Sequence, residues 1–313
     1  MNKTHKYKFI DVNEINSLVK NISFNVVSKC EQMYTNKLSN ITNLIVKNPN
    51  TYKILLLAGP SSSGKTTTAQ LLKDYLRAKG IGAWSISLDD FFLTRENLPT
   101  LSNGNPDYES IASLDLPLIH KCLNELVTNS ISEFPVFDFI TNERSNFKRT
   151  IKIGKKDILI LEGLHALNPS LLCDYYSNKC LKVYVSVSTS YIYQNKIIIS
   201  PQNLRLIRRI IRDCKFRNTP AYETLKSWPT VCEGEEKYIV PFKNSAEIFI
   251  DSCISYEPCI FHNYLEEIIN NCNKDDYFYP KLLEVHNKLM YFNKLNSAII
   301  PPNSILREFI GLT

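Results

Sequence analysis

The sequence predicts an α/β fold, a doubly wound parallel sheet with flanking helices, extended by a helical N-terminal arm and a helical C-terminal extension. Five short aliphatic runs alternate with longer segments of helical periodicity, and such runs are typical of parallel strands covered on both faces. The first run leads directly into a glycine-rich loop and then into a helical pattern. The runs are Ile54–Leu57, Trp84–Leu88, Ile158–Leu161, Leu181–Val187 and Glu247–Ile250. In such a sheet, ligands bind at the carboxyl ends of the strands.

The chain divides into three regions by pattern. Residues 1–50 are polar with helical spacing and predict the helical arm, whereas residues 51–255 hold the five aliphatic runs and predict the core. Residues 256–313 read as helices, and we expect them to form an extension that packs on the core. Within the core, an arginine-rich segment at about residues 202–220 is expected to form a lid.

Composition excludes several classes of protein. Of the 313 residues, 44% are apolar and 22% charged, which is ordinary for a globular protein, and the net charge of +6 suits anionic phosphates without requiring nucleic acid. The nine cysteines form no CxxC pair, and the five histidines form no HxH or HxxxH pair, so neither a disulfide scaffold nor a zinc site is predicted. With no signal-peptide core and no long apolar run, a cytoplasmic protein without a membrane partner is expected.

The loop after the first aliphatic run matches a phosphate-binding motif. Residues 59–66, Gly-Pro-Ser-Ser-Ser-Gly-Lys-Thr, fit the pattern GxxxxGK[ST], the P-loop of the P-loop NTPase fold. Backbone N–H groups of such a loop, helped by the N-terminus of the next helix, bind an anion. The expected ATP-binding residues here are Gly59, Ser61, Ser62, Ser63, Gly64, Lys65, Thr66 and Thr67. Lys65 would reach the β- and γ-phosphates, and the Thr66 hydroxyl would bind Mg²⁺.

Acidic residues follow two of the aliphatic runs. Asp89 and Asp90 come after Ile86-Ser87-Leu88, and Glu162 follows Leu161. Both positions would emerge at the same edge of the sheet as the P-loop. Phosphoryl transfer needs a metal ligand and a base for the attacking hydroxyl. We therefore expect Asp89 to act as base and Glu162 to lie near Mg²⁺, with Asp89 as a second metal ligand where the roles are shared. Asp90 equally suits a role in capping the turn.

Arginines recur along one helical segment. Arg205, Arg208, Arg209 and Arg212 fall at i, i+3, i+4 and i+7, on one side of the predicted helix. Guanidinium groups bind phosphate oxygens in bidentate fashion. The segment therefore predicts a movable lid that closes over ATP and neutralises charge in the transition state. A solvated basic face and a nucleic-acid-binding surface are the alternatives, and neither further basic segments nor aromatic platforms support the second.

Taken together, these motifs resemble the uridine kinase-like P-loop nucleoside kinases of the phosphoribulokinase/uridine kinase superfamily. The chain is most similar to a bacterial branch in which such a kinase follows a threonyl-tRNA-synthetase-like N-terminal region. The segments that carry the resemblance are AGPSSSGKTT from Ala58, SLDDFF from Ser87, FPVFDFITNER from Phe134, LEGLHAL from Leu161 and RLIRRIIRD from Arg205. The ending NSILREFIG is similar to the tail of that branch.

The resemblance implies roles for single residues. Asp89 matches the base for a sugar 5′-hydroxyl, Asp107 matches an acid that binds ribose hydroxyls, and Arg205 and Arg208 match lid arginines that face substrate and phosphate. Arg209 and Arg212, in the same predicted lid, are expected to bind ATP. In the base pocket the family pattern P-x-Y-D-F-x-x-H has Phe137 for its tyrosine, Phe139 as a stacking ring and Asn142 for its histidine. These two replacements remove a hydroxyl and an imidazole, and so change the hydrogen bonds available to the edge of a pyrimidine base.

The function predicted is transfer of the ATP γ-phosphoryl group to a nucleoside 5′-hydroxyl, with ATP and Mg²⁺ as cofactors and a small-molecule substrate as partner. A P-loop kinase for another small alcohol, such as pantothenate or a sugar phosphate, is the nearest alternative. A non-catalytic nucleotide-binding regulator is the second. The sequence leaves homo-oligomerisation and the choice between ATP and GTP open.

Overall fold

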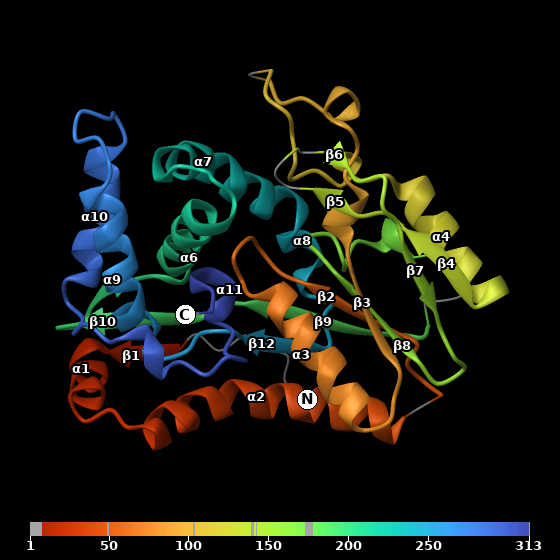
Figure 1. Cartoon of the computed structure of the whole chain (residues 1–313), viewed down its shortest axis with the longest axis horizontal. Helices are drawn as coiled ribbons and strands as arrows, with labels where there is room; N and C mark the ends of the chain where they lie inside the picture. Colours follow the sequence, from red (N-terminus) through yellow and green to blue (C-terminus); the bar gives the residue numbers. More distant parts are fainter. Residues whose placement is uncertain are drawn as a thin grey trace.

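The centre of the molecule is a parallel sheet of five strands (Figure 1). The computed structural model describes residues 8–48, 50–102, 104–138, 141, 143–172 and 178–312. The strands lie in the order β12 (Ile248–Asp251), β9 (Cys180–Ser186), β2 (Ile54–Ala58), β8 (Ile158–Glu162) and β3 (Ala83–Ser87), and all neighbours are parallel. The sequence prediction of a doubly wound parallel sheet built from five aliphatic runs is confirmed.

Helices cover both faces of this sheet, which explains why the central strands are apolar throughout. Leu55 and Leu57 of β2 belong to the larger core cluster, which includes the buried faces of α2 (Phe24–Lys47) and α3 (Lys65–Ala78). The alternate residue Leu56 belongs to a second cluster with α4 (Leu116–Asn129). Successive strand residues point to opposite faces of the sheet. Because helices cover each face, both sets of side chains are buried.

The N-terminal arm is part of the main core. Asp11 caps α1 (Val12–Lys20) by accepting a hydrogen bond from Asn13 N at 2.7 Å, and α2 then crosses the base of the molecule in Figure 1. On the buried face of α2, the Tyr34 hydroxyl lies 2.6 Å from Thr68 Oγ1 on α3. The arm also contributes a strand, β1 (Lys8–Asp11), which the sequence pattern did not predict.

In the described part of the chain, three smaller sheets border the central one. The first has the order β1, β10 (Thr189–Tyr193) and β11 (Lys196–Ile199); the others pair β4 (Ile131–Phe134) with β7 (Arg149–Lys152) and β5 (Phe137–Asp138) with β6 (Glu143–Arg144). The tight turn between β10 and β11 contains Gln194 and Asn195, both with positive φ, as two-residue hairpin turns require. No helix in the described ranges is long and apolar enough to cross a membrane.

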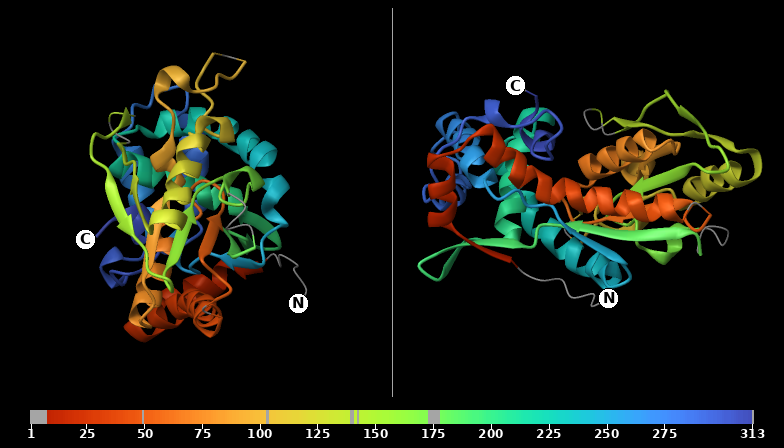
Figure 2. Two further views of the ribbon diagram at one scale, coloured as in Figure 1. Left: turned by 90° about the vertical axis from the view of Figure 1, so that its right-hand side faces the viewer. Right: turned by 90° about the horizontal axis from the view of Figure 1, so that it is seen from below.

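The remaining α-helices lie in the second half of the chain. They are α6 (Pro201–Phe216), α7 (Ala221–Tyr238), α8 (Val240–Lys243), α9 (Glu257–Asn270), α10 (Tyr279–Leu289) and α11 (Arg307–Ile310). In the right-hand view of Figure 2 the C-terminal helices and α4 lie at opposite ends of the molecule. The segment expected to form a lid, α6, has contacts with α7, α9 and α11 and is therefore enclosed by other helices.

Candidate active site

The P-loop connects β2 to α3 and is shaped by two glycines. A Cβ on Gly59 would lie 2.0 Å from the Val185 carbonyl oxygen of β9, so only glycine fits there. Gly64, the N-cap of α3, has a φ of 85°, in the left-handed region that glycine favours. Lys65 begins α3, and its Nζ donates to the Pro60 carbonyl oxygen at 3.0 Å. The loop thus curls around the lysine side chain that is expected to bind phosphate.

Two carboxylates stand at the same sheet edge as this loop. Glu162 is the last residue of β8, and the register pairs it with Leu57 on β2 and Ser87 on β3. Asp89 lies two residues beyond the end of β3. Glu162 is buried and accepts a hydrogen bond from Thr66 Oγ1 at 3.1 Å. The parallel sheet therefore brings the P-loop and both predicted acids together.

Burial sets the charge of these groups. Burial, together with the negative charge of Asp89, raises the pKa of Glu162 to about 7. Burial lowers the pKa of Lys65, whereas Glu162 and Asp89 act in the opposite direction. A cation beside Glu162 and Asp89 would relieve the repulsion between these two carboxylates.

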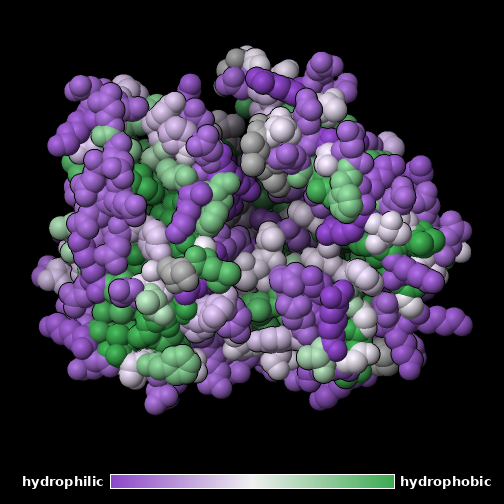
Figure 3. Space-filling model, in the orientation of Figure 1, coloured by the Kyte–Doolittle hydropathy of each residue, from purple (hydrophilic) through white to green (hydrophobic). Residues whose placement is uncertain are grey.

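A cleft of about 350 Å³ opens above these residues. In Figure 3 the surface is hollowed in this region, between the side of α7 and the segment around residues 95–110. Of the predicted site residues, ten line the cleft: Ser61, Ser62, Lys65, Thr66, Asp89, Asp107, Phe137, Glu162, Arg209 and Arg212. Arg217 lines it as well. The phosphate-binding loop, the predicted base and the predicted metal ligands therefore share one cavity.

The arginines of the cleft are arranged by one buried carboxylate. Asp213 lies 2.8 Å from a guanidinium nitrogen of Arg212, 3.3 Å from one of Arg209 and 3.8 Å from one of Arg217. Arg209 also donates to Ser61 Oγ at 2.8 Å. Burial and the charge of Arg212 lower the pKa of Arg217 to about 10, which reflects three cations around a single anion. This wall of the cleft is positive and suited to phosphate.

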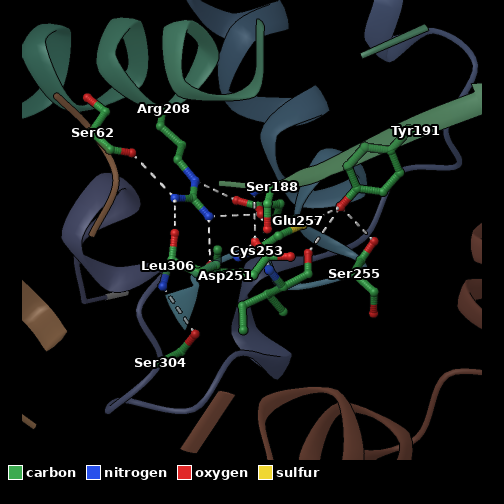
Figure 4. A network of polar contacts seen from close by, with 12 residues as sticks. Ser62, Ser188, Tyr191, Arg208, Asp251, Cys253, Ser255, Glu257, Ser304 and Leu306 are labelled. Carbon is green, nitrogen blue, oxygen red and sulfur yellow. Dashed lines mark hydrogen bonds and ion pairs between the residues drawn. The ribbon is translucent and has the colours of Figure 1, made fainter. Parts of the chain in front are cut away.

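Arg205 and Arg208 take a different place from the one expected. Neither lines the cleft, because both guanidiniums are held by carboxylates beneath the P-loop. Arg208 is fully buried and makes a bidentate pair with Glu257 of α9, at 2.8 and 2.9 Å, beside Ser252 at the end of β12 (Figure 4). Arg205 lies 2.6 Å from Glu235 of α7.

Both side chains nevertheless contact the loop from below. Arg205 donates to the Ser61 carbonyl oxygen at 3.2 Å, and Arg208 donates to that of Ser62 at 3.3 Å. The expectation that α6 presents four guanidiniums to the nucleotide is thus corrected. Two arginines support the P-loop from the interior, and two face the cleft.

The expected substrate side of the cleft is described in part. Asp107 is buried, and its carboxylate accepts from Glu109 N at 3.0 Å, Ser110 N at 3.1 Å and Tyr238 Oη at 3.2 Å. Phe137 packs edge-on against Phe92, with ring centroids 5.6 Å apart. The predicted residues Phe139 and Asn142 lie outside the described residues.

Asp90 was expected either to act in the site or to cap the turn that follows it, and its carboxylate instead contacts a distant strand. Its Oδ1 accepts from Phe137 N at 3.1 Å, and its Oδ2 lies 3.4 Å from Arg149. The side chain therefore fixes β5 beside the cleft.

Sequence reasoning missed several residues that line the cleft. Glu109 is half-buried, and burial of its carboxyl group raises its pKa to about 7; its Oε2 has no hydrogen-bond partner among the described residues. Its side chain packs so closely on Gly234 of α7 that a Cβ there would lie 2.3 Å from Glu109 Cβ. Glu308, in the tail, also lines the cleft. Gly234, a single glycine inside the helical pattern of α7, was the sequence signal for the close approach of Glu109.

A profile of the phosphoribulokinase/uridine kinase family matches residues 54–256, well over half of the chain. The chain belongs to the phosphoribulokinase/uridine kinase family. Among its relatives, a uridine kinase of Lactobacillus johnsonii is 29% identical over 198 residues, covering 63% of this chain and 85% of the relative. A uridine kinase of Bacillus pumilus is 27% identical over the same length and the same shares.

Two solved structures are similar to this chain over about two thirds of its length. A possible uridine kinase from Bacillus stearothermophilus covers 69% of this chain and 98% of its own, with 18% identity and a TM-score of 0.48. A putative fructose transport system kinase from Silicibacter sp. TM1040 covers 68% and 98%, with 14% identity and a TM-score of 0.44. As a member of the phosphoribulokinase/uridine kinase family, the chain is an ATP-dependent phosphotransferase, and the family range contains the P-loop, both acids and the arginines of α6.

Proposed function

We propose that this kinase transfers the γ-phosphoryl group of ATP to the 5′-hydroxyl of a nucleoside. One observation carries the proposal: Lys65 of the P-loop, after β2, and Asp89, after β3 on the far side of β8, line the same cavity. A bound phosphate chain and an acceptor hydroxyl would thereby share one cleft. Relatives that are named uridine kinases support a nucleoside as the acceptor.

Each group has a proposed role in the transfer. Lys65 and the P-loop N–H groups bind the phosphates, while Arg209 and Arg212 neutralise charge that develops on the transferred group. Asp89 accepts the proton of the attacking hydroxyl as the new P–O bond forms and the bond to ADP breaks. Arg205 and Arg208, assigned to phosphate by the sequence, are proposed to act indirectly by holding the Ser61 and Ser62 carbonyls.

The residues at the base of the cleft fit a magnesium ion. Thr66 supplies a hydroxyl and Glu162 a buried carboxylate at hydrogen-bond distance from it, while Asp89 supplies a second carboxylate. Mg²⁺ prefers such hard oxygen ligands, and carboxylates held together in a buried site favour a cation. We therefore propose Thr66, Glu162 and Asp89 as its binding residues. When bound, the ion would neutralise charge on the ATP phosphates.

The acceptor side of the proposed site combines aromatic rings with one acid. Phe92, Tyr108 and Phe137 line the cleft. The Phe92 ring packs edge-on against both Tyr108 and Phe137, with ring centroids 5.7 and 5.6 Å apart, respectively. Asp107 lies at the same wall, and we propose that its carboxylate binds sugar hydroxyls. An aromatic wall suits the flat face of a base and selects weakly among bases, since it offers no hydrogen-bond pattern to read.

A substrate panel tests this proposal. The protein is incubated with ATP, Mg²⁺ and, in turn, uridine, cytidine, adenosine, guanosine, pantothenate and simple sugars, and ADP release and product mass are measured. We expect turnover with a nucleoside, giving the 5′-monophosphate. Asp89→Asn should lower kcat by about 10² to 10⁴-fold with little change in ATP affinity. Asp74→Asn, on the exposed face of α3, is the matched control. Turnover only with pantothenate or a sugar would refute the nucleoside assignment, and no turnover with any acceptor would refute the kinase reaction.

A further inference from the structure

A carboxylate from the C-terminal tail occupies hydrogen-bond donors of the phosphate-binding site. Glu308 Oε2 accepts from Thr67 N at 3.0 Å and from Thr67 Oγ1 at 2.7 Å. Thr67 is the third residue of α3, directly after Lys65 and Thr66. Backbone N–H groups at this end of a P-loop helix are the donors that hold nucleotide phosphates. An acidic side chain therefore takes the position of a ligand anion.

The tail holds Glu308 firmly in this place. Ile305, Leu306 and Phe309 around it are fully buried, and Ser304 Oγ donates to Glu31 of α2 at 2.7 Å. The Phe309 ring lies 4.8 Å below the Arg208 guanidinium. Because the tail backbone is anchored on both sides of residue 308, the Glu308 side chain is the part that can move without unfolding the tail.

One carboxylate oxygen and a phosphate oxygen cannot accept from the same two donors at once. A phosphate that takes the Thr67 donors must displace Glu308, and two anions held side by side would repel each other in a partly buried site. The positive charges of Lys65 and Arg212 lie at the same end of the cleft and stabilise whichever anion is bound.

Resting on the proposed function, we propose that Glu308 is an internal competitor of the nucleotide phosphates and sets the affinity of the P-loop for ATP. In the nucleotide-free protein it caps α3, since the N-cap residue Gly64 has no side chain to do so. ATP binding then includes rotation of the Glu308 side chain away from Thr67. The residue lies beyond the family-matched range, so this competition is added by the C-terminal extension.

Calorimetric titration with ATP and Mg²⁺ tests the proposal. Glu308→Gln, which keeps the shape and removes the charge, should lower the Kd and the KM for ATP by about tenfold while leaving kcat within a factor of about two. Glu308→Ala should act in the same direction, and its lower melting temperature would report the lost helix cap. Glu284→Gln, an exposed glutamate of α10 paired with Lys281 and Lys288, is the control and should change nothing in the titration.

The outcomes separate this inference from the function on which it rests. If the wild-type protein binds and turns over ATP, but both Glu308 variants bind it equally well or more weakly, the competition is refuted and the kinase function stands. If neither wild type nor variant binds ATP with Mg²⁺, the proposed function fails, and the competition fails with it.

A second observation, remote from the cleft, carries an independent inference. His262 and Glu266 of α9 and His286 of α10 bring one ligand atom each within 4.8 Å of one another. Both histidines are buried, with 4% and 9% of their surface exposed, and the Nε2 atom of each has no hydrogen-bond partner in the described part of the chain. The sequence spacing predicted no zinc site, because the two histidines come from different helices.

The surroundings prepare these side chains for a cation. His262 Nδ1 lies 3.1 Å from the Phe292 carbonyl oxygen, which favours the tautomer with its lone pair on Nε2. Both Glu266 oxygens lie 2.6 to 2.7 Å from Lys294 Nζ, so one of them can bind a metal while the other keeps this contact. We propose a divalent transition-metal site with two imidazole ligands, one carboxylate and water, of the kind that zinc accepts.

Metal titration of the chelator-treated protein tests this site. Zn²⁺ followed by calorimetry, and Co²⁺ followed by its visible absorption, should each show one site. Glu266→Gln, at the half-buried ligand, and His286→Ala should weaken binding at least about tenfold, whereas His120→Ala, at a histidine bound to the Ser170 carbonyl, should not. Absence of binding up to millimolar Zn²⁺, or equal affinity in the Glu266 and His286 variants, would refute the site.

Discussion

Replacement of Arg208 by methionine should destabilise the whole protein, because its guanidinium connects four separate parts of the chain. It makes five hydrogen bonds of 2.8 to 3.3 Å to Ser62, Ser252 and Glu257. Neither Arg208 nor Glu257 is exposed. Removing one partner of such a pair leaves a buried uncompensated charge and costs about 3–5 kcal/mol, a large share of a typical folding free energy. Urea unfolding followed by far-ultraviolet circular dichroism measures this loss.

A double-variant cycle separates this structural role from phosphate binding. Arg208→Met and Glu257→Met should each destabilise, whereas the double variant should be less destabilised than the sum of the two, since no lone charge then remains. A change below about 1 kcal/mol in the Arg208 variant, with ATP binding lost in a stably folded protein, would refute the reasoning. The arginine would then act on phosphate, as the sequence resemblance implied.

Three further changes test other parts of the site. Lys65→Ala should weaken ATP binding and lower kcat together, measured by calorimetry and ADP release, and unchanged values would remove the P-loop from the site. Gly59→Ala should abolish ATP binding because its Cβ would lie 2.0 Å from the Val185 carbonyl oxygen. Gly80→Ala, where a φ of 75° strains the backbone but no atom lies within 4 Å of the new Cβ, should lower stability and retain ATP binding. The pKa of Glu109 is raised from 4.5 to about 7, so between these pH values the folded protein keeps the carboxyl protonated while the unfolded chain loses the proton. The contribution of Glu109 to the free energy of unfolding is therefore fully present below pH 4.5 and is lost as the pH rises through 7. Glu109→Gln should therefore be near neutral at pH 5 and stabilising by up to about 3 kcal/mol at pH 8 in urea unfolding, and equal effects at both pH values would contradict this.

The sheet and the P-loop could be predicted because their signals are local. A strand buried on both faces requires a run of apolar residues, and all five such runs became strands of the central sheet. The tight loop requires Gly59 and Gly64 at fixed positions, so its motif is contiguous in sequence. Asp89 and Glu162 followed from the same logic, since the ends of parallel strands meet at one edge.

Contacts between distant segments could not be predicted in this way. The spacing of the arginines in α6 indicated one exposed face, but Glu235 and Glu257, from two later helices, bury Arg205 and Arg208. Periodicity reports which residues share a face, and it does not report which other element covers that face. For the same reason the contact of Glu308 with Thr67, across 241 residues, left no signal in the sequence pattern.

The two extensions outside the family-matched range both contact α3, the helix that follows the P-loop. From the N-terminal side, the Tyr34 hydroxyl lies 2.6 Å from Thr68 Oγ1, and from the C-terminal side Glu308 binds Thr67. Glu31 of the N-terminal arm is bound to the C-terminal side as well, because its carboxylate accepts from Tyr256, the residue before α9, and from Ser304 of the tail. Residues 54–256 therefore supply the groups proposed to perform the chemistry, whereas the extensions fix the first turn of α3, on which the P-loop lysine sits. Differences in nucleotide affinity between this kinase and its shorter relatives are accordingly expected to originate in the extensions, even where every residue of the P-loop is shared.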